Sequence, residues 1–238
     1  MKLNKSMKTT MSLAAFALVT NLASSAAVTT VLTDAATWDY LHPQDALNPA
    51  TADTDFNTTW YTQNDAGNSY NGPGFNDSGS GIFGYGAISN GTVTEDIGTP
   101  ASGSRYTAYF VSTFNLGTIA ANTVTDLTAN ILADDAAFVY INGQLAGGIN
   151  IVGLSDTYFG LAASSGNEAS LTTIALDQSL LIDGENSISV SVHQRSNGNT
   201  DLGFTMDDLN VTSTAVPEPT TTALLALGGL ALILRRRR

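Results

Sequence analysis

The sequence predicts an all-β body, arranged as a β-sandwich or a barrel, and two observations support this. Apolar residues recur at every second position through the central part of the chain, which is typical of half-buried strands. Turn signals separate these runs at short intervals. Many short strands joined by regular turns are typical of sandwiches and barrels.

The clearest strand is predicted at residues 187–192, where serine alternates with an apolar residue. Ile188, Val190 and Val192 share one face and the serines share the other, because successive side chains of a strand point to opposite sides. The same alternation predicts three further strands, with apolar faces formed by Leu202, Phe204 and Met206, by Leu127, Ala129 and Ile131, and by Tyr106, Ala108, Phe110 and the more distant Phe114.

Turn chemistry bounds these strands. Asn142-Gly143 follows the apolar run 138–141 and favours a tight hairpin, and residues 183–186 break the chain before the serine-alternating strand. Residues 64–90 are rich in Gly, Asn, Ser and Asp and are expected to be mostly loop. Five aromatic residues in or just before this stretch are expected to fill the core rather than to stack on a ligand. They are Trp38, Trp60, Phe75, Phe83 and Tyr85.

Residues 1–26 are predicted to be a secretory signal peptide with a helical apolar segment. Three lysines precede the apolar stretch 11–22, and the small residues that follow predict cleavage after Ala26 or Ala27. The sandwich domain is then expected to occupy residues 28–213.

The C-terminal residues 216–238 have three parts. The first is Val216, Pro217, Glu218 and Pro219, in which each proline disfavours helix at the preceding residue and keeps the segment extended. The second is an apolar segment, 220–234, predicted to be a short membrane helix. The third consists of four arginines, which are expected to stop transfer and to stay on the cytoplasmic side: Arg235, Arg236, Arg237 and Arg238.

The apolar segment is short for a permanent anchor. Its uncharged core, 223–234, spans about 18 Å at a rise of 1.5 Å per residue. The hydrocarbon core of a bilayer is about 30 Å thick. A segment of this length suits a temporary anchor.

This order of motif, apolar run and arginine cluster resembles the PEP-CTERM sorting signal of Gram-negative bacteria. The resemblance implies that a membrane transpeptidase-like exosortase recognises Pro217-Glu218-Pro219 and that the tail is removed. It also implies transit through the inner membrane and delivery to the cell surface or to an extracellular polysaccharide matrix. A plain C-terminal membrane anchor is the alternative, which the short span disfavours.

A second set of motifs extends over residues 38–211. In chain order these are Trp38-Asp39-Tyr40-Leu41, Phe75-Asn76-Asp77-Ser78, Phe83-Gly84-Tyr85-Gly86, the run 109–114, the run 133–143, Gly184-Glu185-Asn186, Val192-His193-Gln194 and Asp201-Leu202-Gly203-Phe204. Their order is similar to that of galactose-binding-like jelly-roll domains, which are common accessory modules of secreted bacterial proteins. The resemblance implies a jelly-roll-like β-sandwich.

The body is strongly acidic. Of 21 acidic residues only Glu218 lies in the C-terminal tail, and of nine basic residues only Arg105 and Arg195 lie between the two chain ends, so the body carries a net charge near −18. Such a surface repels phosphate backbones, which excludes nucleic acid as an expected partner. The absence of cysteine excludes disulfides and thiolate chemistry.

Six residues are candidates for ligand binding. Asp134 and Asp135 offer adjacent carboxylates for calcium, although aspartates in this position also favour a tight turn. His193 falls on the serine face of its strand, which is expected to be solvated. There it is either part of a polar site at the sheet edge or a solvated or hydrogen-bonded histidine. The remaining candidates are Asn142, Arg195 and Asp201.

Support for catalysis is poor. His42 is the only other histidine, and no serine lies in a Gly-x-Ser-x-Gly turn, so neither a nucleophilic triad nor a histidine-rich zinc site is expected. A pair of carboxylates for glycoside hydrolysis stays open, because its separation is a three-dimensional property.

The expected function is therefore that of an exported, non-enzymatic protein of the cell surface or exopolysaccharide matrix that binds glycans. One alternative is an acidic structural component of the matrix that bridges cations without sugar specificity. A second alternative is a carbohydrate-active enzyme.

Overall fold

The computed structural model describes residues 26–44, 46–62, 75–89, 91–166 and 170–214, all within the unit Ser25–Val216. Two six-stranded β-sheets make up this unit. The signal helix and the membrane helix predicted from the sequence lie outside the described residues. Within the described ranges, no helix has the length and apolar character needed to cross a bilayer.

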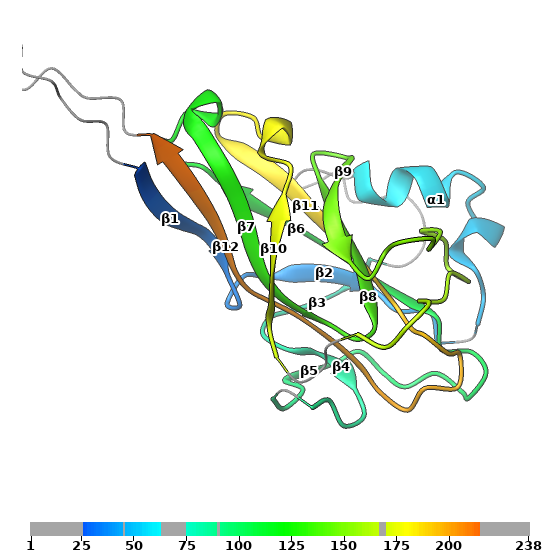
Figure 1. Cartoon of the computed structure of the whole chain (residues 1–238). Coiled ribbons are helices and arrows are strands. Elements are labelled where there is room, and N and C mark those ends of the chain that lie inside the picture. Colours follow the sequence, from blue (N-terminus) through cyan, green and yellow to red (C-terminus); the bar gives the residue numbers. More distant parts are fainter. Residues whose placement is uncertain (1–25, 45, 63–74, 90, 167–169, 215–238) are drawn as a thin grey trace, which may run out of the picture. The chain divides into compact units, whose positions relative to one another are not determined.

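Sheet A has the strand order β10-β7-β12-β4-β5, and β1 also pairs with β12 (Figure 1). Neighbours are antiparallel except for the parallel pair β4 and β5. The strands are β1 (Ala26–Thr33), β4 (Phe83–Tyr85), β5 (Glu95–Asp96), β7 (Val124–Ala133), β10 (Thr172–Leu176) and β12 (Leu202–Thr214).

Sheet B has the order β3-β2-β6-β11-β8-β9, and its pairs are antiparallel. Its strands are β2 (Trp38–Leu41), β3 (Asp77–Gly79), β6 (Thr107–Asn115), β8 (Ala136–Ile141), β9 (Gln144–Ile149) and β11 (Glu185–His193). Short helical turns join them: η1 (Pro49–Thr51), α1 (Phe56–Thr59), η2 (Trp60–Thr62), η3 (Ala121–Thr123) and η4 (Gln178–Leu180). This arrangement confirms the predicted β-sandwich and is consistent with a jelly roll.

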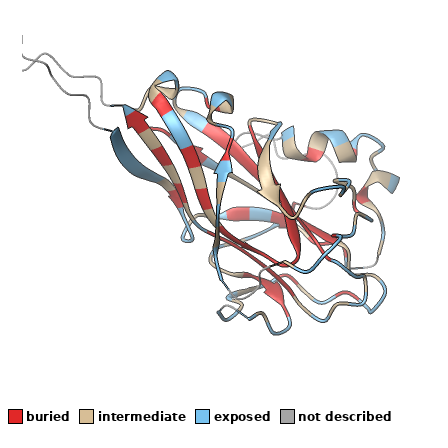
Figure 2. Cartoon of the chain, in the orientation of Figure 1, coloured by how far each residue is buried: buried red, intermediate tan, exposed pale blue. Residues whose placement is uncertain are grey.

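The main core lies between the two sheets, where their inward-facing residues meet. The Phe204 ring of sheet A lies 5.3 Å from the Trp38 ring and 4.4 Å from the Phe110 ring, both on sheet B. Alternation along the strands produces the bands of buried residues on β7 and β12 in Figure 2. The four apolar faces predicted from alternation all contribute buried residues to this core.

A second, aromatic core covers the outer face of sheet B. Tyr109, Phe138 and Tyr140 point outward from this sheet and pack under α1, η2 and part of the segment 150–162. The Trp60 ring lies 4.8 Å from the Tyr109 ring. Because both faces of sheet B are covered, β8 is buried at every residue.

The two cores together test two predictions. The five aromatic residues expected in the core are all buried, which confirms that interpretation: Trp38, Trp60, Phe75, Phe83 and Tyr85. The hypothesis that the serine face of β11 is solvated is wrong, because Ser187, Ser189 and Ser191 are all buried. The outer layer excludes water from this face.

A row of polar side chains crosses the outer face of sheet A. Thr173 on β10 donates to Asn130 on β7, and the Asn130 amide donates to both carboxylate oxygens of Asp208 on β12. Asn210 also donates to Asp208, and Thr30 on β1 donates to Asn210. Cross-strand pairs of this kind hold neighbouring strands in register.

The predicted hairpin at Asn142-Gly143 joins β8 and β9. Both residues have positive φ, 48° and 76°, as the tight turn requires. Within the loop-rich stretch 64–90, the described residues form two three-residue strands, β3 and β4, joined by irregular chain. The prediction that this stretch is mostly loop is confirmed for the part that is described.

The strands define two opposite ends of the sandwich. The tail end contains η3, η4, the β8–β9 turn and the paired ends of β1 and β12, where Ala26 lies opposite Thr214 (Figure 1). The predicted cleavage positions Ala26 and Ala27 both lie in β1. The loop end contains the Asp134-Asp135 turn and the segments 99–106, 154–166 and 194–201.

Candidate functional site

The Asp134-Asp135 turn joins β7 to β8, and the Asp135 carboxylate is fully buried there. Its Oδ2 accepts hydrogen bonds from the backbone N–H of Arg195 at 2.7 Å and from the Asn199 amide at 3.1 Å. Its Oδ1 accepts the N–H of Gly166 at 3.2 Å. A Cβ at Gly166 would lie 2.4 Å from the Asp135 carbonyl oxygen, so only glycine allows this approach. One carboxylate therefore ties two loops to the turn.

Calcium was the cofactor predicted for Asp134 and Asp135, and the geometry of Asp135 does not fit it. Both of its oxygens face N–H donors, whereas calcium requires a shell of oxygen ligands. Among the described residues, no three His, Cys, Asp or Glu side chains are grouped so that they could hold a metal ion. Calcium binding stays a prediction from the sequence.

The two arginines of the body lie on loops that bind each other. The backbone N–H groups of Gly103 and Arg105 donate to the Asn197 carbonyl, and the Arg105 guanidinium donates to the Asn199 and Pro100 carbonyls. Arg195, in contrast, has an exposed side chain. The only basic groups of an acidic body are therefore gathered at the loop end.

Three aromatic rings form a cluster beside these loops. Tyr106 lies 5.3 Å from Tyr158 and 5.0 Å from Phe159, and Tyr158 and Phe159 are 5.0 Å apart. Phe159 is 52% exposed, and the Asn197 amide donates to the Tyr106 hydroxyl at 2.9 Å. The loop end thus combines an exposed aromatic ring, side-chain amides and one exposed guanidinium.

His193 is buried in a polar network that includes a residue the sequence did not single out, Asp156. The His193 Nε2 lies 2.9 Å from the Asp156 carboxylate, and Nδ1 lies 3.1 Å from the Gly160 carbonyl, so both ring nitrogens face acceptors. Ser191 and Tyr140 also donate to Asp156, at 2.7 and 2.6 Å. Burial raises the pKa of Tyr140, and the Asp156 carboxylate adds to this, so the hydroxyl keeps its proton and donates it.

This network holds parts of a nucleophilic triad without its arrangement. Ser191 and Asp156 contact the same ring nitrogen of His193, whereas in a triad the nucleophile and the acid lie on different nitrogens. Thr107, on the other nitrogen, is fully buried and donates to the Tyr158 carbonyl. The arrangement clamps the segment 156–160 onto sheet B.

The structure brings five of the six candidate residues to the loop end. They are Asp134, Asp135, His193, Arg195 and Asp201. Asn142 lies at the tail end. Its amide donates to the Leu180 carbonyl and to Asn186, and its Oδ1 accepts the Ser187 N–H, so the side chain fastens the β8–β9 turn.

Sequence reasoning missed Tyr158 and Phe159 of the aromatic cluster and also Asp156. These three residues lie on the long connection between β9 and β10, which has no regular periodicity. The pair Tyr158-Phe159, flanked by Gly153 and Gly160, was the available signal. Nothing local links Asp156 to His193, which lies 37 positions later along the chain.

His42 predicts a pH dependence of stability. Burial lowers its pKa from 6.5 to about 4, and its ring stacks on Tyr85 at 5.5 Å. The unfolded chain binds a proton at this residue below pH 6.5 and the folded chain does so only near pH 4, so stability falls as the pH falls through this window, by up to about 3 kcal/mol.

Denaturant unfolding between pH 7 and pH 4 checks this expectation against His42→Phe. The variant keeps the stacked ring, and the Ile97 carbonyl that His42 contacts keeps a donor from Gln44. It should lose less stability than the unaltered protein over this range. Equal pH slopes would contradict the assignment.

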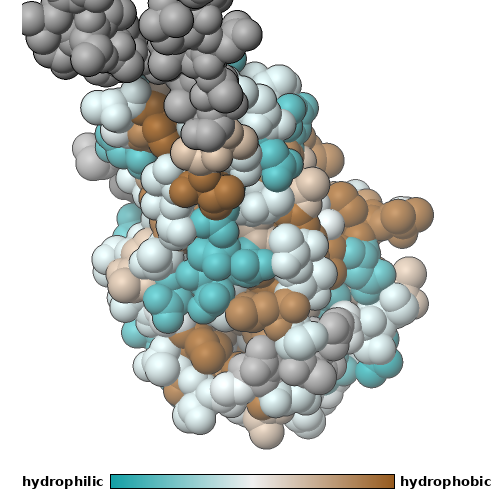
Figure 3. Space-filling view, turned by 60° about the vertical axis from the view of Figure 1, so that its left-hand side comes forward, coloured by the Kyte–Doolittle hydropathy of each residue, from teal (hydrophilic) through white to brown (hydrophobic). Residues whose placement is uncertain are grey.

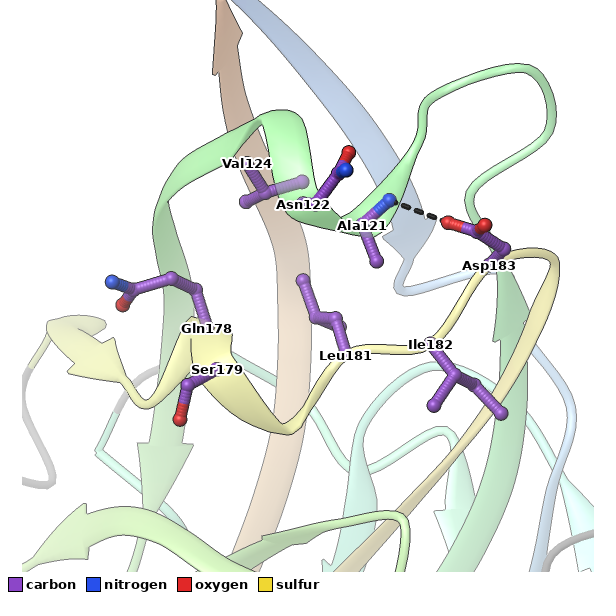
Figure 4. A pocket seen from close by; sticks show the side chains of 8 residues that line it. All are labelled: Ala121, Asn122, Val124, Gln178, Ser179, Leu181, Ile182 and Asp183. Atoms are coloured by element: carbon purple, nitrogen blue, oxygen red, sulfur yellow. Dashed lines mark hydrogen bonds between the residues drawn. The ribbon is translucent and has the colours of Figure 1, made fainter.

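A shallow hollow of about 550 Å³ lies at the tail end, between η3 and η4 (Figure 4). Leu181 and Val124 form part of its wall, and a hydrogen bond from the Ala121 N–H to Asp183 closes one side. Ile182 beside it is 54% exposed. On the face shown in Figure 3, hydrophobic groups form several separate areas with hydrophilic groups between them.

Comparison with known proteins identifies the C-terminal segment. Residues 215–238 match the family model described as the PEP-CTERM protein-sorting motif. This match confirms the sorting motif predicted at residues 216–219. No curated protein matches the sequence.

Comparison with solved structures finds distant similarity to bacterial glycosidases. A β-glucuronidase from Ruminococcus gnavus matches with a TM-score of 0.42 and 10% identity, over 80% of this chain and 29% of the enzyme. β-Glucuronidase 2 from Bacteroides uniformis matches with a TM-score of 0.39 and 13% identity, over 79% of this chain and 18% of the enzyme. The chain spans less than a third of the length of these enzymes.

Proposed function

We propose that this chain, which carries a PEP-CTERM sorting motif at its C-terminus, is an exported, non-enzymatic protein of the cell surface or exopolysaccharide matrix that binds glycans at its loop end. The sorting motif at 215–238 is the observation that carries the proposal. In this proposal an exosortase removes the tail while the protein is held briefly in the inner membrane. The acidic sandwich is then the mature protein.

The loop end supports glycan binding through its chemistry. An exposed aromatic ring offers a flat apolar surface on which the C–H face of a sugar ring packs, and Phe159 is supported from behind by Tyr106 and Tyr158. The exposed guanidinium of Arg195 supplies donors for sugar hydroxyls, and the Asn197 amide holds the Tyr106 hydroxyl in place. The two loops that carry these groups are held by Asp135 and by the Arg105 hydrogen bonds, so the site is ordered before a ligand arrives.

A glycan array with the secreted protein tests this proposal, including polysaccharide from the producing bacterium. Phe159→Ala is expected to weaken binding about tenfold, or ~1.4 kcal/mol, because it removes the stacking surface. Leu145→Ala is the matched control, since Leu145 on β9 is a similarly exposed apolar residue away from the cluster. Absence of binding to every glycan, or equal binding by the two variants, would refute glycan binding at the loop end.

The net charge near −18 of the body supports a second candidate, an acidic matrix component that bridges cations. This candidate predicts that the secreted protein associates with itself when calcium is present and that added sugars do not change this association. Light scattering with and without calcium and with added glycans separates the two functions.

The non-enzymatic part of the proposal has its own support. The histidine that pairs with a carboxylate, His193, is fully buried, and so is the serine beside it, Ser191. Neither side chain is exposed to a substrate. Turnover of any glycoside by the secreted protein would refute this part.

A further inference from the structure

The distance between the folded body and the sorting motif is very short. β12 ends at Thr214, and the motif begins two residues later at Val216. An extended chain spans at most about 3.6 Å per residue, so Val216 lies within about 7 Å of Thr214 and Pro219 within about 18 Å. A protein that binds the motif therefore acts close to the tail end of the sandwich.

Thr214 is firmly held in the fold. Its hydroxyl donates to the Thr123 carbonyl of η3, and its neighbour Ser213 pairs with Val124 of β7, and both contacts are independent of the residues removed with the signal peptide. A strand end held in this way does not unpair to lengthen the link, the chain between the folded body and the sorting motif. An enzyme domain of 100 residues has a radius of gyration of about 13 Å, which is comparable with the whole link. A domain of that size bound at the motif therefore lies close to the tail end.

The tail end has a surface suited to such contact. The hollow between η3 and η4 adjoins Val124, the residue opposite Ser213, so it lies beside the last residues of β12. Ile182, at 54% exposure, and Val28 on β1, at 69%, present apolar side chains at the same end. Asn122, Gln178 and Ser179 add polar groups around the hollow.

We propose that the tail end, through the hollow and Ile182, is a docking surface for the membrane sorting enzyme that cleaves at Pro217-Glu218-Pro219. This inference rests on the proposed sorting and adds that the enzyme reads the folded body as well as the linear motif. A lipid surface fits less well, because Asp183 and Glu185 at this end are repelled by anionic headgroups. A second copy of this acidic chain is disfavoured by the same repulsion.

The test follows tail removal from the full-length chain in the producing bacterium, by pulse labelling and mass analysis. Ile182→Asp places a charge on the docking surface and is expected to slow tail removal about tenfold. Ser179→Tyr, which fills the hollow from an exposed position, should act in the same direction. Val152→Asp is the matched control, because Val152 is 91% exposed and lies beyond the loop-end terminus of β9. Thermal unfolding of each secreted body excludes loss of fold as the cause.

A spacer of ten Gly and Ser residues between Ala215 and Val216 gives a second readout. If the tail end holds the enzyme, the spacer lowers its effective concentration at the motif and slows cleavage. Faster cleavage would mean that the body obstructs the enzyme, and it would overturn the inference. Unchanged rates for Ile182→Asp and Ser179→Tyr would overturn the inference alone, whereas an unaltered chain that keeps its tail would overturn the proposed sorting with it.

Discussion

Replacing Pro217, Glu218 and Pro219 together by alanine is expected to stop removal of the C-terminal tail. Each proline disfavours helix at the residue before it, and Glu218 is the only acidic residue of the tail. With three alanines the segment loses its charge and gains the helix propensity of the apolar helix predicted at 220–234. The protein should then accumulate in the membrane fraction with its four C-terminal arginines.

The control for this experiment lies directly beside the motif. Thr220, Thr221 and Thr222 changed together to alanine alter three neighbouring residues and leave the motif intact. Immunoblots of membrane and extracellular fractions should show normal release for this control. Normal release of the motif variant would show that the tail is removed without recognition of Pro-Glu-Pro.

Asp156→Ala is expected to cause the largest loss of stability from a single change. It deprives Tyr140, Ser191 and His193 of their common acceptor beneath the outer layer. Each buried polar group left without its acceptor costs about 1 to 3 kcal/mol, so a total loss of about 3 to 5 kcal/mol is expected. In a domain of this size such a loss lowers the melting temperature by about 10 °C.

Calorimetry or denaturant unfolding of the secreted body measures this effect. Asp126→Ala is the matched control, since Asp126 is an exposed carboxylate on β7 and its removal should change stability by less than about 0.5 kcal/mol. Ser191→Ala removes one donor only and should fall between the two. An Asp156→Ala variant as stable as the control would contradict the role of this carboxylate as a clamp.

The parts of the fold that follow from local chemistry were predictable from the sequence. Alternation at 187–192 predicted the central strand β11, and the positive φ values of Asn142 and Gly143 agree with the tight turn that an Asn-Gly pair favours. Both signals depend on neighbouring residues alone. The sorting motif has the same local character, because its order and position are readable without a structure.

The outer layer on sheet B was not predictable in this way. It is built from α1, a helix of four residues, and from irregular chain after β9, neither of which has a hydrophobic period. Alternation predicts which residues share a face but not whether that face is later covered. The serines of β11 therefore looked solvated although Trp60, Tyr140 and Asp156 come together over them.

The candidate site was partly visible in the sequence for a related reason. The acidic pair of the β7–β8 turn and the loop after His193 both follow strand ends, so their presence at one edge of a sandwich could be inferred. The hydrogen-bond partners of these residues could not be predicted from the sequence. Arg105 reaches Asn199 across 94 positions, and Asp135 reaches Arg195 across 60, and such pairings depend on the strand order of the whole sheet.

The intact mass of the protein recovered from outside the producing cells tests the central claim most directly. The account predicts a chain that begins after Ala26 or Ala27, within the first two residues of β1, and that has lost the apolar run and the four arginines but keeps the rest of the sandwich through β12. A mass that includes Arg235 to Arg238 would contradict removal of the tail, and with it the proposal that the mature protein is the acidic sandwich alone.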